Sequence, residues 1–233
     1  MRDMPLLIFD VDGTLVDSQD VIVEAQKRTF AAHGLTPPDR ATSLSVVGLS
    51  LREAFEVLAG PDAPIDSLAE HYKSQFNALR ADRSLEPPFF PGAEATIARY
   101  AADENFMLGV ATGKSRRGVR HLFARAGWDE LFATVQTADD HPSKPAPDMI
   151  HAALAETGSA AADAFMIGDT SFDMAMARAA GVRAIGVAWG YHERDALIEA
   201  GAERVIESFA ELDALLSSDR PVPSPRIAGR GLG

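Results

Sequence analysis

Two aspartates, Asp10 and Asp12, directly follow a short apolar segment near the N-terminus. The segment, residues 5–9, has the length of a strand, and the alternation of side chains along a strand puts both carboxylates on the same side. Two carboxylates buried this close together repel each other, and the pKa of one rises, unless a cation or a reacting group lies between them. The pair therefore predicts a reaction centre, and a hard metal ion would remove the conflict.

A hydroxyl follows a second apolar segment. Thr112 comes after a strand expected over residues 106–111, and Gly113 precedes a helix whose N-terminal N–H groups could bind an anion. Thr112 could equally be an ordinary helix cap. The lysine and serine after Gly113 resemble part of a nucleotide-binding P-loop, but the glycine required five residues before Gly113 is Leu108. The sequence therefore excludes an NTPase of that kind.

Two further segments carry charged residues in unusual places. Lys144 lies between a serine and a proline, before a helix expected over residues 147–156, where a cation gains nothing from the helix dipole. Its position suits fixing a phosphate or an ionised nucleophile. Asp169 and Asp173 follow a strand expected over residues 164–167, and as i and i+4 positions at a helix start they share a face. A capped, acid-rich first turn is the alternative interpretation of these two acids.

In this order, the four segments closely resemble the haloacid dehalogenase superfamily of phosphohydrolases: DVDGT, the strand-end Thr112, Lys144 before proline, and GDTSFD. The resemblance covers residues 6–216. It implies that Asp10 is the nucleophile and Asp12 the general acid and base. It also implies that Thr112, Gly113 and Lys144 hold the phosphoryl oxygens.

By the same resemblance, the cofactor is Mg²⁺, coordinated by Asp10, the backbone carbonyl of Asp12, and Asp169. Asp173 would orient Lys144 or a metal-bound water. The physical chemistry agrees, because a carboxylate is a weak nucleophile toward a phosphate dianion unless cations neutralise the approach. The resemblance thus implies a Mg²⁺-dependent phosphatase that acts through an aspartyl-phosphate, with a small, phosphoglycolate-like phosphomonoester as its partner.

Alternatives remain open at this point. The dehalogenases that name the superfamily lack the second aspartate, so the presence of Asp12 favours phosphoryl chemistry. Phosphosugar mutases share all four motifs and differ in how the cap holds the sugar. Phosphonate hydrolases of this group use a cap lysine, for which composition offers Lys27 and Lys73. A non-catalytic phosphoreceiver module would also need an acidic Mg²⁺ pocket, a threonine and a lysine.

The elements that position these residues fall into two kinds. Between residues 16 and 88 the patterns predict only helices, and beyond Gly92 helices and strands alternate, which favours a parallel sheet covered by helices. We therefore expect an α/β fold: a Rossmann-like doubly wound parallel sheet core (1–15 and 89–218) with an inserted α-helical cap domain (16–88) and a flexible tail (219–233). Helices are expected at 18–33, 51–58, 65–79, 93–102, 115–126, 147–156, 172–180, 195–200 and 209–216, and the further strands at 132–137, 182–187 and 204–206.

The cap is expected to select the substrate, since the four motifs can bind only a phosphoryl group and a metal. Ser50 and Arg52, at the start of the helix expected over residues 51–58, offer a hydroxyl and a guanidinium that could meet a polar or anionic leaving group. The alternative is that Ser50 is a helix N-cap and Arg52 an ordinary surface residue.

Composition excludes several classes of function. The 22 Lys and Arg against 34 Asp and Glu give a formal net charge of −12, which argues against a nucleic-acid partner. The chain has no cysteine, so thiolate nucleophiles and cysteine-based zinc sites are absent. The apolar run before Asp10 is too short for a signal peptide or a membrane span, which predicts no membrane partner and a cytoplasmic location. The oligomeric state is left open.

Overall fold

The computed structural model describes residues 4–81 and 86–218. Within these ranges, no helix combines the length and the apolar character needed to cross a membrane. The flexible tail predicted for residues 219–233 lies outside the described residues.

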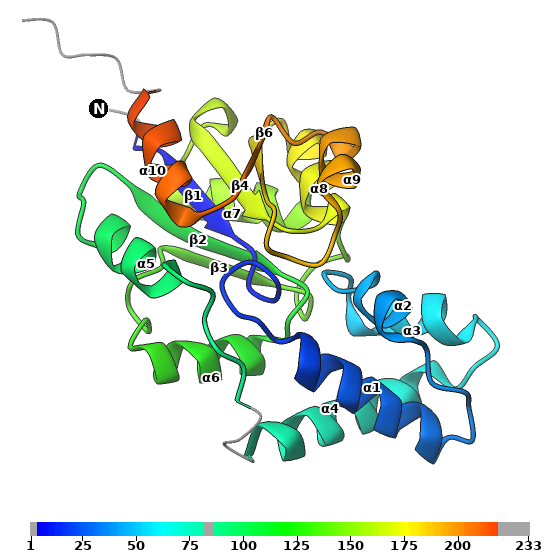
Figure 1. The fold of residues 1–233 in the computed structure, drawn as a ribbon. Coiled ribbons are helices and arrows are strands. Elements are labelled where there is room, and N and C mark those ends of the chain that lie inside the picture. The colour runs from blue at the N-terminus through cyan, green and yellow to red at the C-terminus, as the bar shows by residue number, and fades with distance from the viewer. Residues whose placement is uncertain (1–3, 82–85, 219–233) are drawn as a thin grey trace, which may run out of the picture.

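The centre of the molecule is a six-stranded sheet in the order β3-β2-β1-β4-β5-β6 (Figure 1). All neighbouring strands are parallel. The strands are β1 (Leu6–Phe9), β2 (Met107–Thr112), β3 (Thr134–Thr137), β4 (Ala164–Gly168), β5 (Arg183–Val187) and β6 (Arg204–Ile206). β1 lies between β2 and β4, so the first and most apolar strand is covered on both edges and both faces, as its continuous apolar run requires.

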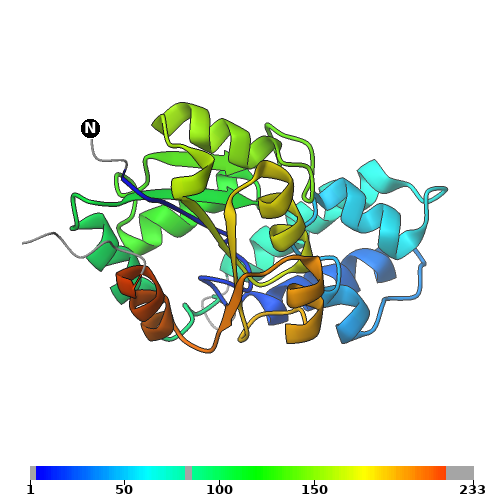
Figure 2. The same cartoon turned by 90° about the horizontal axis from the view of Figure 1, so that it is seen from above.

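Helices cover both faces of this sheet, and Figure 2 shows them as layers on either side. Alternate side chains of β1 point to opposite faces: Leu7 and Phe9 belong to one buried cluster, and Leu6 and Ile8 to another. α5 (Ala93–Ala101), α6 (Arg116–Ala126) and α10 (Phe209–Ser218) contribute to the first cluster. α7 (Asp148–Thr157), α8 (Ser171–Ala180) and α9 (Arg194–Ala200) contribute to the second. The predicted doubly wound parallel sheet is confirmed.

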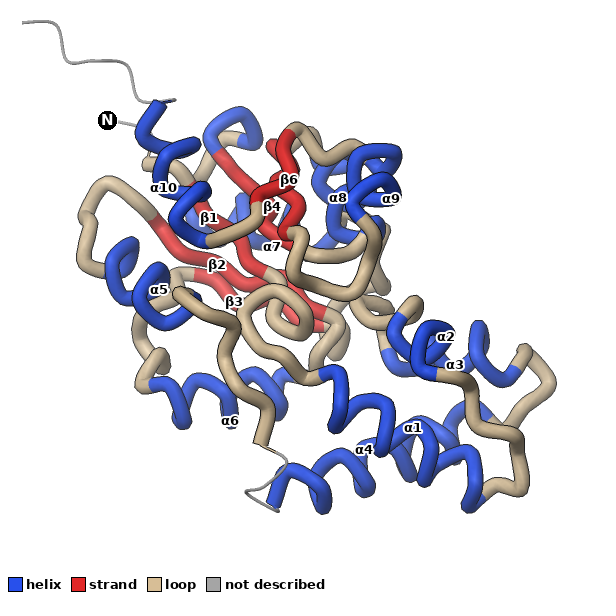
Figure 3. The backbone as a smooth tube through the Cα atoms, viewed as in Figure 1, coloured by secondary structure: helices blue, strands red, loops and turns tan. Residues whose placement is uncertain are grey.

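The remaining helices lie together beside the sheet (Figure 3). They are α1 (Gln19–Ala32), α2 (Arg40–Leu44), α3 (Leu51–Ala59) and α4 (Ile65–Ala81). Phe30, Phe55, Ile65 and Leu68 form a small buried cluster of their own. The division into a core and a cap at residues 16 and 88 stays a prediction, but this separate apolar cluster is what such a cap would need.

Helix α2 was not expected from the sequence. It spans only five residues, too few for a hydrophobic period, and its start depends on one side chain. The carboxylate of Asp39 accepts a hydrogen bond from the backbone N–H of Thr42 at 2.8 Å. The sequence reading missed this local cap.

The two segments that connect the sheet to the helical part run side by side. The backbone N–H of Asp17 donates to the carbonyl of Pro88 at 2.9 Å, and that of Phe90 donates to the carbonyl of Leu15 at 3.0 Å. The outgoing and returning segments are therefore hydrogen-bonded to each other next to the two predicted boundaries, at residues 15–16 and 88–89.

Candidate active site

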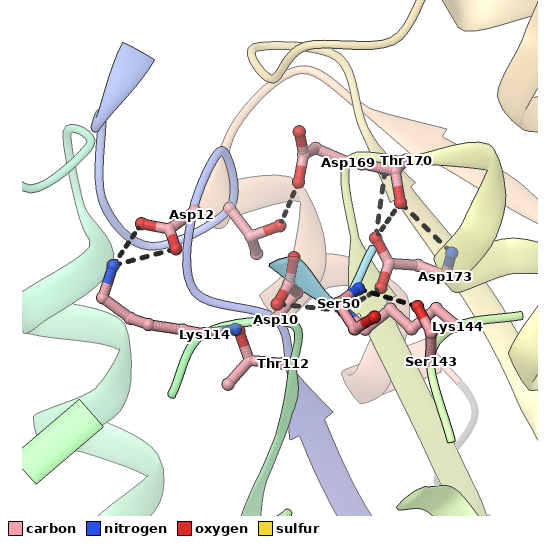
Figure 4. Close-up of polar contacts among 11 residues, drawn as sticks. Asp10, Asp12, Ser50, Thr112, Lys114, Ser143, Lys144, Asp169, Thr170 and Asp173 are labelled. Atoms are coloured by element: carbon pink, nitrogen blue, oxygen red, sulfur yellow. Dashed lines mark hydrogen bonds and ion pairs between the residues drawn. The ribbon is translucent and has the colours of Figure 1, made fainter. Parts of the chain in front are cut away.

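Asp10 lies one residue beyond the end of β1, at the centre of the carboxyl edge of the sheet (Figure 4). Its backbone N–H donates to the carbonyl of Ile167 at 2.9 Å, which extends the pairing of β1 with β4. The side chain is 1 % exposed. Because parallel strands bring their carboxyl ends to one edge, the ends of β1, β2 and β4 place their polar residues around this carboxylate.

Lys144 is fully buried between two carboxylates (Figure 4). Its Nζ lies 3.0 Å from Oδ1 of Asp10 and 2.6 Å from Oδ1 of Asp173. Burial alone would lower the pKa of Lys144, but the charges of Asp10 and Asp173 outweigh it and raise the pKa above its usual value. The lysine is thus held as a cation beside the proposed nucleophile.

Burial has the opposite effect on the carboxylates. It raises the pKa of Asp10 to about 6, with a further rise from Asp173 and a partly offsetting decrease from Lys144. It also raises the pKa of Asp169 well above its usual value, helped by the charges of Asp10 and Asp173. Both acids therefore lie in an environment that favours an added cation.

Asp169 is fixed by hydrogen bonds from two loops. Its Oδ1 accepts from the hydroxyl of Thr14 at 3.0 Å, and its Oδ2 accepts from the backbone N–H of Tyr191 at 2.9 Å. Gly13 and Gly190 come so close that a Cβ on either would lie within 2.1 Å of an Asp169 atom. Gly13 also has a φ of +89°, which favours glycine. The loops therefore fit around Asp169 only with glycine at these positions.

Asp173 both caps a helix and contacts Lys144, the two roles considered from the sequence. It completes a capping box at the start of α8, because its Oδ2 accepts from the backbone N–H of Thr170 at 3.1 Å. The Thr170 hydroxyl donates to the same oxygen at 2.6 Å. Its other oxygen holds Lys144. The helix cap therefore fixes the carboxylate that orients the lysine.

The three buried acids fit a hard divalent cation. One oxygen each of Asp10, Asp169 and Asp173 lie within 4.8 Å of one another. Oδ2 of Asp10 is buried, and no donor among the described residues forms a hydrogen bond to it. Three carboxylates with one lysine leave negative charge uncompensated, and oxygen donors are what Mg²⁺ prefers.

The side chain of Asp12 points away from the acidic cluster, toward Lys114 (Figure 4). Nζ of Lys114 lies 2.8 Å and 2.9 Å from its two oxygens, and the Ser18 hydroxyl donates to Oδ1 at 2.6 Å. Lys114 also lies 5.0 Å from the centre of the Phe76 ring on α4. Of Asp12, only the backbone carbonyl was expected to bind metal, which is consistent with this separation of the side chain from the acidic cluster.

The phosphate-binding residues predicted after β2 lie at the same edge. Thr112 is the last residue of β2, one residue later than expected, and its Oγ1 accepts from the backbone N–H of Lys114 at 3.2 Å. A Cβ on Gly113 would lie 2.5 Å from the carbonyl oxygen of Gly48, so the loop before α3 lies directly against it. The backbone N–H of Ser50 donates to Oγ of Ser143 at 2.7 Å. The helical part thus touches the sheet beside the site.

A cavity of about 960 Å³ opens between the sheet edge and the helices. Asp10, Asp12, Thr112 and Gly113 line it, together with Ser50 and Arg52. Ser50 is the N-cap of α3, and Arg52 makes exposed ion pairs with Asp66 and Glu56. Their role in selecting a substrate stays a prediction. Lys73 also lines the cavity and pairs with Glu70 at 2.7 Å, whereas Lys27 is exposed outside the residues that line it.

Sequence reasoning missed some residues that build this site. Thr14 stands inside the first motif, but its bond to Asp169 spans 155 residues and no local pattern shows it. Lys114 stands in the segment that resembles part of a P-loop, a likeness that gives no sign of its contact with Asp12, and no pattern in the sequence singles out Tyr191. The position of Lys114, two residues after Thr112, is the one feature of the sequence that could have indicated its contact with Asp12.

The chain is similar in sequence and in fold to known hydrolases. A family model described as haloacid dehalogenase-like hydrolase matches residues 7–187. The chain is 35 % identical over 215 residues to "Probable phosphatase IndB" from Dickeya dadantii, which covers 89 % of this chain and 91 % of that protein. It is 33 % identical over 223 residues to a phosphoglycolate phosphatase from Rhodospirillum rubrum, covering 92 % of each. The crystal structure of a hydrolase from Pseudomonas syringae is similar with a TM-score of 0.82 at 26 % identity, over 93 % of this chain and 100 % of that one.

Proposed function

We propose that this chain, which belongs to the haloacid dehalogenase-like hydrolase family, is a Mg²⁺-dependent phosphatase that forms an aspartyl-phosphate on Asp10. The predicted family and the prediction of an enzyme are confirmed, so a non-catalytic phosphoreceiver module is not supported. One observation carries the finer proposal: the buried Oδ2 of Asp10 accepts no hydrogen bond within the described ranges and lies beside Lys144 and two further acids.

Asp10 is the proposed nucleophile. Oδ2 would attack phosphorus while the bond from phosphorus to the leaving oxygen breaks, which moves the phosphoryl group onto the carboxylate. Lys144, held as a cation, would neutralise part of the repulsion between this carboxylate and the phosphate dianion. Thr112 and Gly113 would hold the phosphoryl oxygens; the support is that Thr112 ends β2 and Gly113 follows it at the same edge of the sheet.

Asp12 is the proposed general acid and base. Its protonated carboxyl would give its proton to the leaving alkoxide, and the carboxylate would then take a proton from the water that attacks the phosphoryl group. That attack breaks the bond from phosphorus to Asp10 and restores the free carboxylate. Lys114 and Ser18 hold the Asp12 side chain at the edge of the same cavity, apart from the cluster around Asp10.

Asp10, Asp169 and the backbone carbonyl of Asp12 would hold Mg²⁺, with Asp173 close enough to contribute. When bound, the ion supplies positive charge that offsets the repulsion between carboxylate and phosphate. Thr14 and the backbone of Tyr191 would keep Asp169 oriented toward it.

We propose small organic phosphomonoesters as substrates. The support is a relative named phosphoglycolate phosphatase, together with a cavity that reaches from Asp10 to the helical part. Ser50 and Arg52 remain the predicted contacts to the leaving group on that side.

A single experiment tests the proposal. Phosphate release from p-nitrophenyl phosphate should require Mg²⁺, stop with chelator, and be absent in Asp10→Asn, while Asp12→Asn should accumulate phosphorylated protein. Full turnover without metal, or in folded Asp10→Asn, would refute the mechanism. Interconversion of sugar phosphates without phosphate release would instead show a mutase.

A further inference from the structure

The cavity is lined by five cationic side chains, and three of them already have carboxylate partners. Arg52 pairs with Asp66 and Glu56, Lys73 with Glu70, and Lys114 with Asp12. Arg80 and Arg117 are the other two cations of the lining. Across residues 4–81 and 86–218, neither of them forms an ion pair with a carboxylate.

Arg80 and Arg117 come from different parts of the molecule. Arg80 is in the last turn of α4, in the helical part, and Arg117 is in the first turn of α6, against the sheet. Both line the same cavity, and the pKa of Arg80 is lowered by burial and then by the charge of Arg117. The charge of Glu86 offsets part of this decrease in the pKa of Arg80. The ion pair of Glu86, however, is with Arg125, at 3.4 Å.

Two guanidinium groups that line one cavity without an anion repel each other. Such an arrangement is stable in water only because solvent screens it, and an anion placed between the groups would turn repulsion into attraction. A guanidinium presents two parallel N–H donors that match a phosphoryl group or a carboxylate. The pair therefore has the charge and the donors of an anion-binding site.

We propose that Arg80 and Arg117 bind a second anionic group on the leaving group of the substrate. This inference rests on the proposed phosphatase function, and it narrows the substrates to phosphomonoesters that carry another phosphoryl group or a carboxylate. The same cavity joins this pair to Asp10 and Thr112, so one molecule can reach both sites. At about 960 Å³ the cavity has room for a leaving group well beyond two carbons.

Binding would also hold the helical part against the sheet. Arg80 is on α4 and Arg117 on α6, so an anion bound by both would link the two helices across the cavity that Asp10 also lines. The second anion of the substrate would thereby close the cavity around the phosphoryl group, as substrate-driven closure does in other enzymes.

The test compares phosphate esters that differ only at the far end. The substrates are 6-hydroxyhexyl, 5-carboxypentyl and 6-phosphonohexyl phosphate. p-Nitrophenyl phosphate, whose leaving group carries no second anionic group, serves as the reference. For the protein as it is, kcat/KM should be higher for the esters that end in an anion. Arg80→Ala and Arg117→Ala should each lower this preference about 10- to 100-fold, the loss expected for hydrogen bonds to a charged group, mainly through KM.

Controls separate this role from a general effect. Arg120→Ala removes an exposed guanidinium from the same helix α6 but outside the residues that line the cavity, and it should change nothing. Arg117→Lys should keep part of the preference. Turnover of p-nitrophenyl phosphate should stay within about twofold in all these variants, because its leaving group has no second anion to lose.

Two results would overturn the inference. One is equal kcat/KM for the hydroxyl and the anionic esters in the unmodified protein, and the other is an equal loss for every ester in the arginine variants. If no ester is hydrolysed, the proposed function fails, and calorimetry with hexane-1,6-bisphosphonate against hexylphosphonate still tests the site. Tighter binding of the bisphosphonate that Arg80→Ala abolishes would support it, and equal affinities would overturn it.

Discussion

Replacing Lys144 with methionine should destabilise the metal-free protein more than any other single loss of charge at the site. The lysine is fully buried and lies 3.0 Å from Asp10 and 2.6 Å from Asp173, so its removal leaves carboxylates buried without a counter-ion. Breaking a buried ion pair from one side costs about 3–5 kcal/mol of unfolding free energy. For a chain of this size that corresponds to a fall in Tm of about 6–20 °C.

The loss should depend on pH in a defined direction. Burial already raises the pKa of Asp10 to about 6, and without Lys144 it should rise further. A carboxyl whose pKa is higher in the folded state binds more protons when folded, so its contribution to stability falls as the pH rises through that window. Lys144→Met should therefore lose most stability near pH 8 and less near pH 5, where Asp10 and Asp169 take up protons.

Urea unfolding in the presence of chelator, at both pH values, measures this effect. The matched control is Lys73→Met, whose exposed ammonium pairs with Glu70 at 2.7 Å and should contribute less than about 1 kcal/mol. Adding Asp173→Asn to Lys144→Met should recover part of the loss, because one buried charge disappears. A Lys144→Met protein that loses less than about 1 kcal/mol near pH 8, or loses more near pH 5, would refute the reasoning.

Three further outcomes are expected. Asp12→Asn should lower phosphate release about 10²- to 10⁴-fold with little change in Tm, and a normal rate would contradict its role in proton transfer. Mg²⁺ affinity, measured by calorimetry, should weaken about tenfold per pH unit for each proton that the ion displaces, and so by up to about a hundredfold per pH unit below about pH 6, where both Asp10 and Asp169 are protonated. An affinity independent of pH would contradict this. Gly13→Ala should weaken Mg²⁺ binding and lower Tm, because the added Cβ would lie 2.1 Å from an oxygen of Asp169. Gly34→Ala is the control: Gly34 also has a positive φ, but its Cβ would have no atom within 4 Å, so this variant should lower Tm and leave Mg²⁺ affinity unchanged.

Much of the site follows from the sequence because each chemical residue stands next to a pattern that locates it. Asp10, Thr112 and Asp169 each end or directly follow an apolar strand. Parallel strands expose their carboxyl ends at one edge, so three local patterns are enough to predict that distant residues meet. Lys144 was placed by its unusual position before a helix.

The fold was predictable for a similar reason. Alternating helices and strands favour a doubly wound sheet, and the continuous apolar run of β1 indicates a strand buried on both faces. The short helix α2 escaped prediction because five residues carry no period and its start depends on the Asp39 cap.

The sequence by itself determined which residues could react and at which edge of the sheet they would lie, because strand periodicity and the direction of the chain are local properties. Only the tertiary structure decided how those residues are held: Lys114 contacts Asp12, and Thr14 donates a hydrogen bond to Asp169. These contacts join segments far apart in the chain, and their distances depend on how whole elements pack. No pattern within a single segment contains that information.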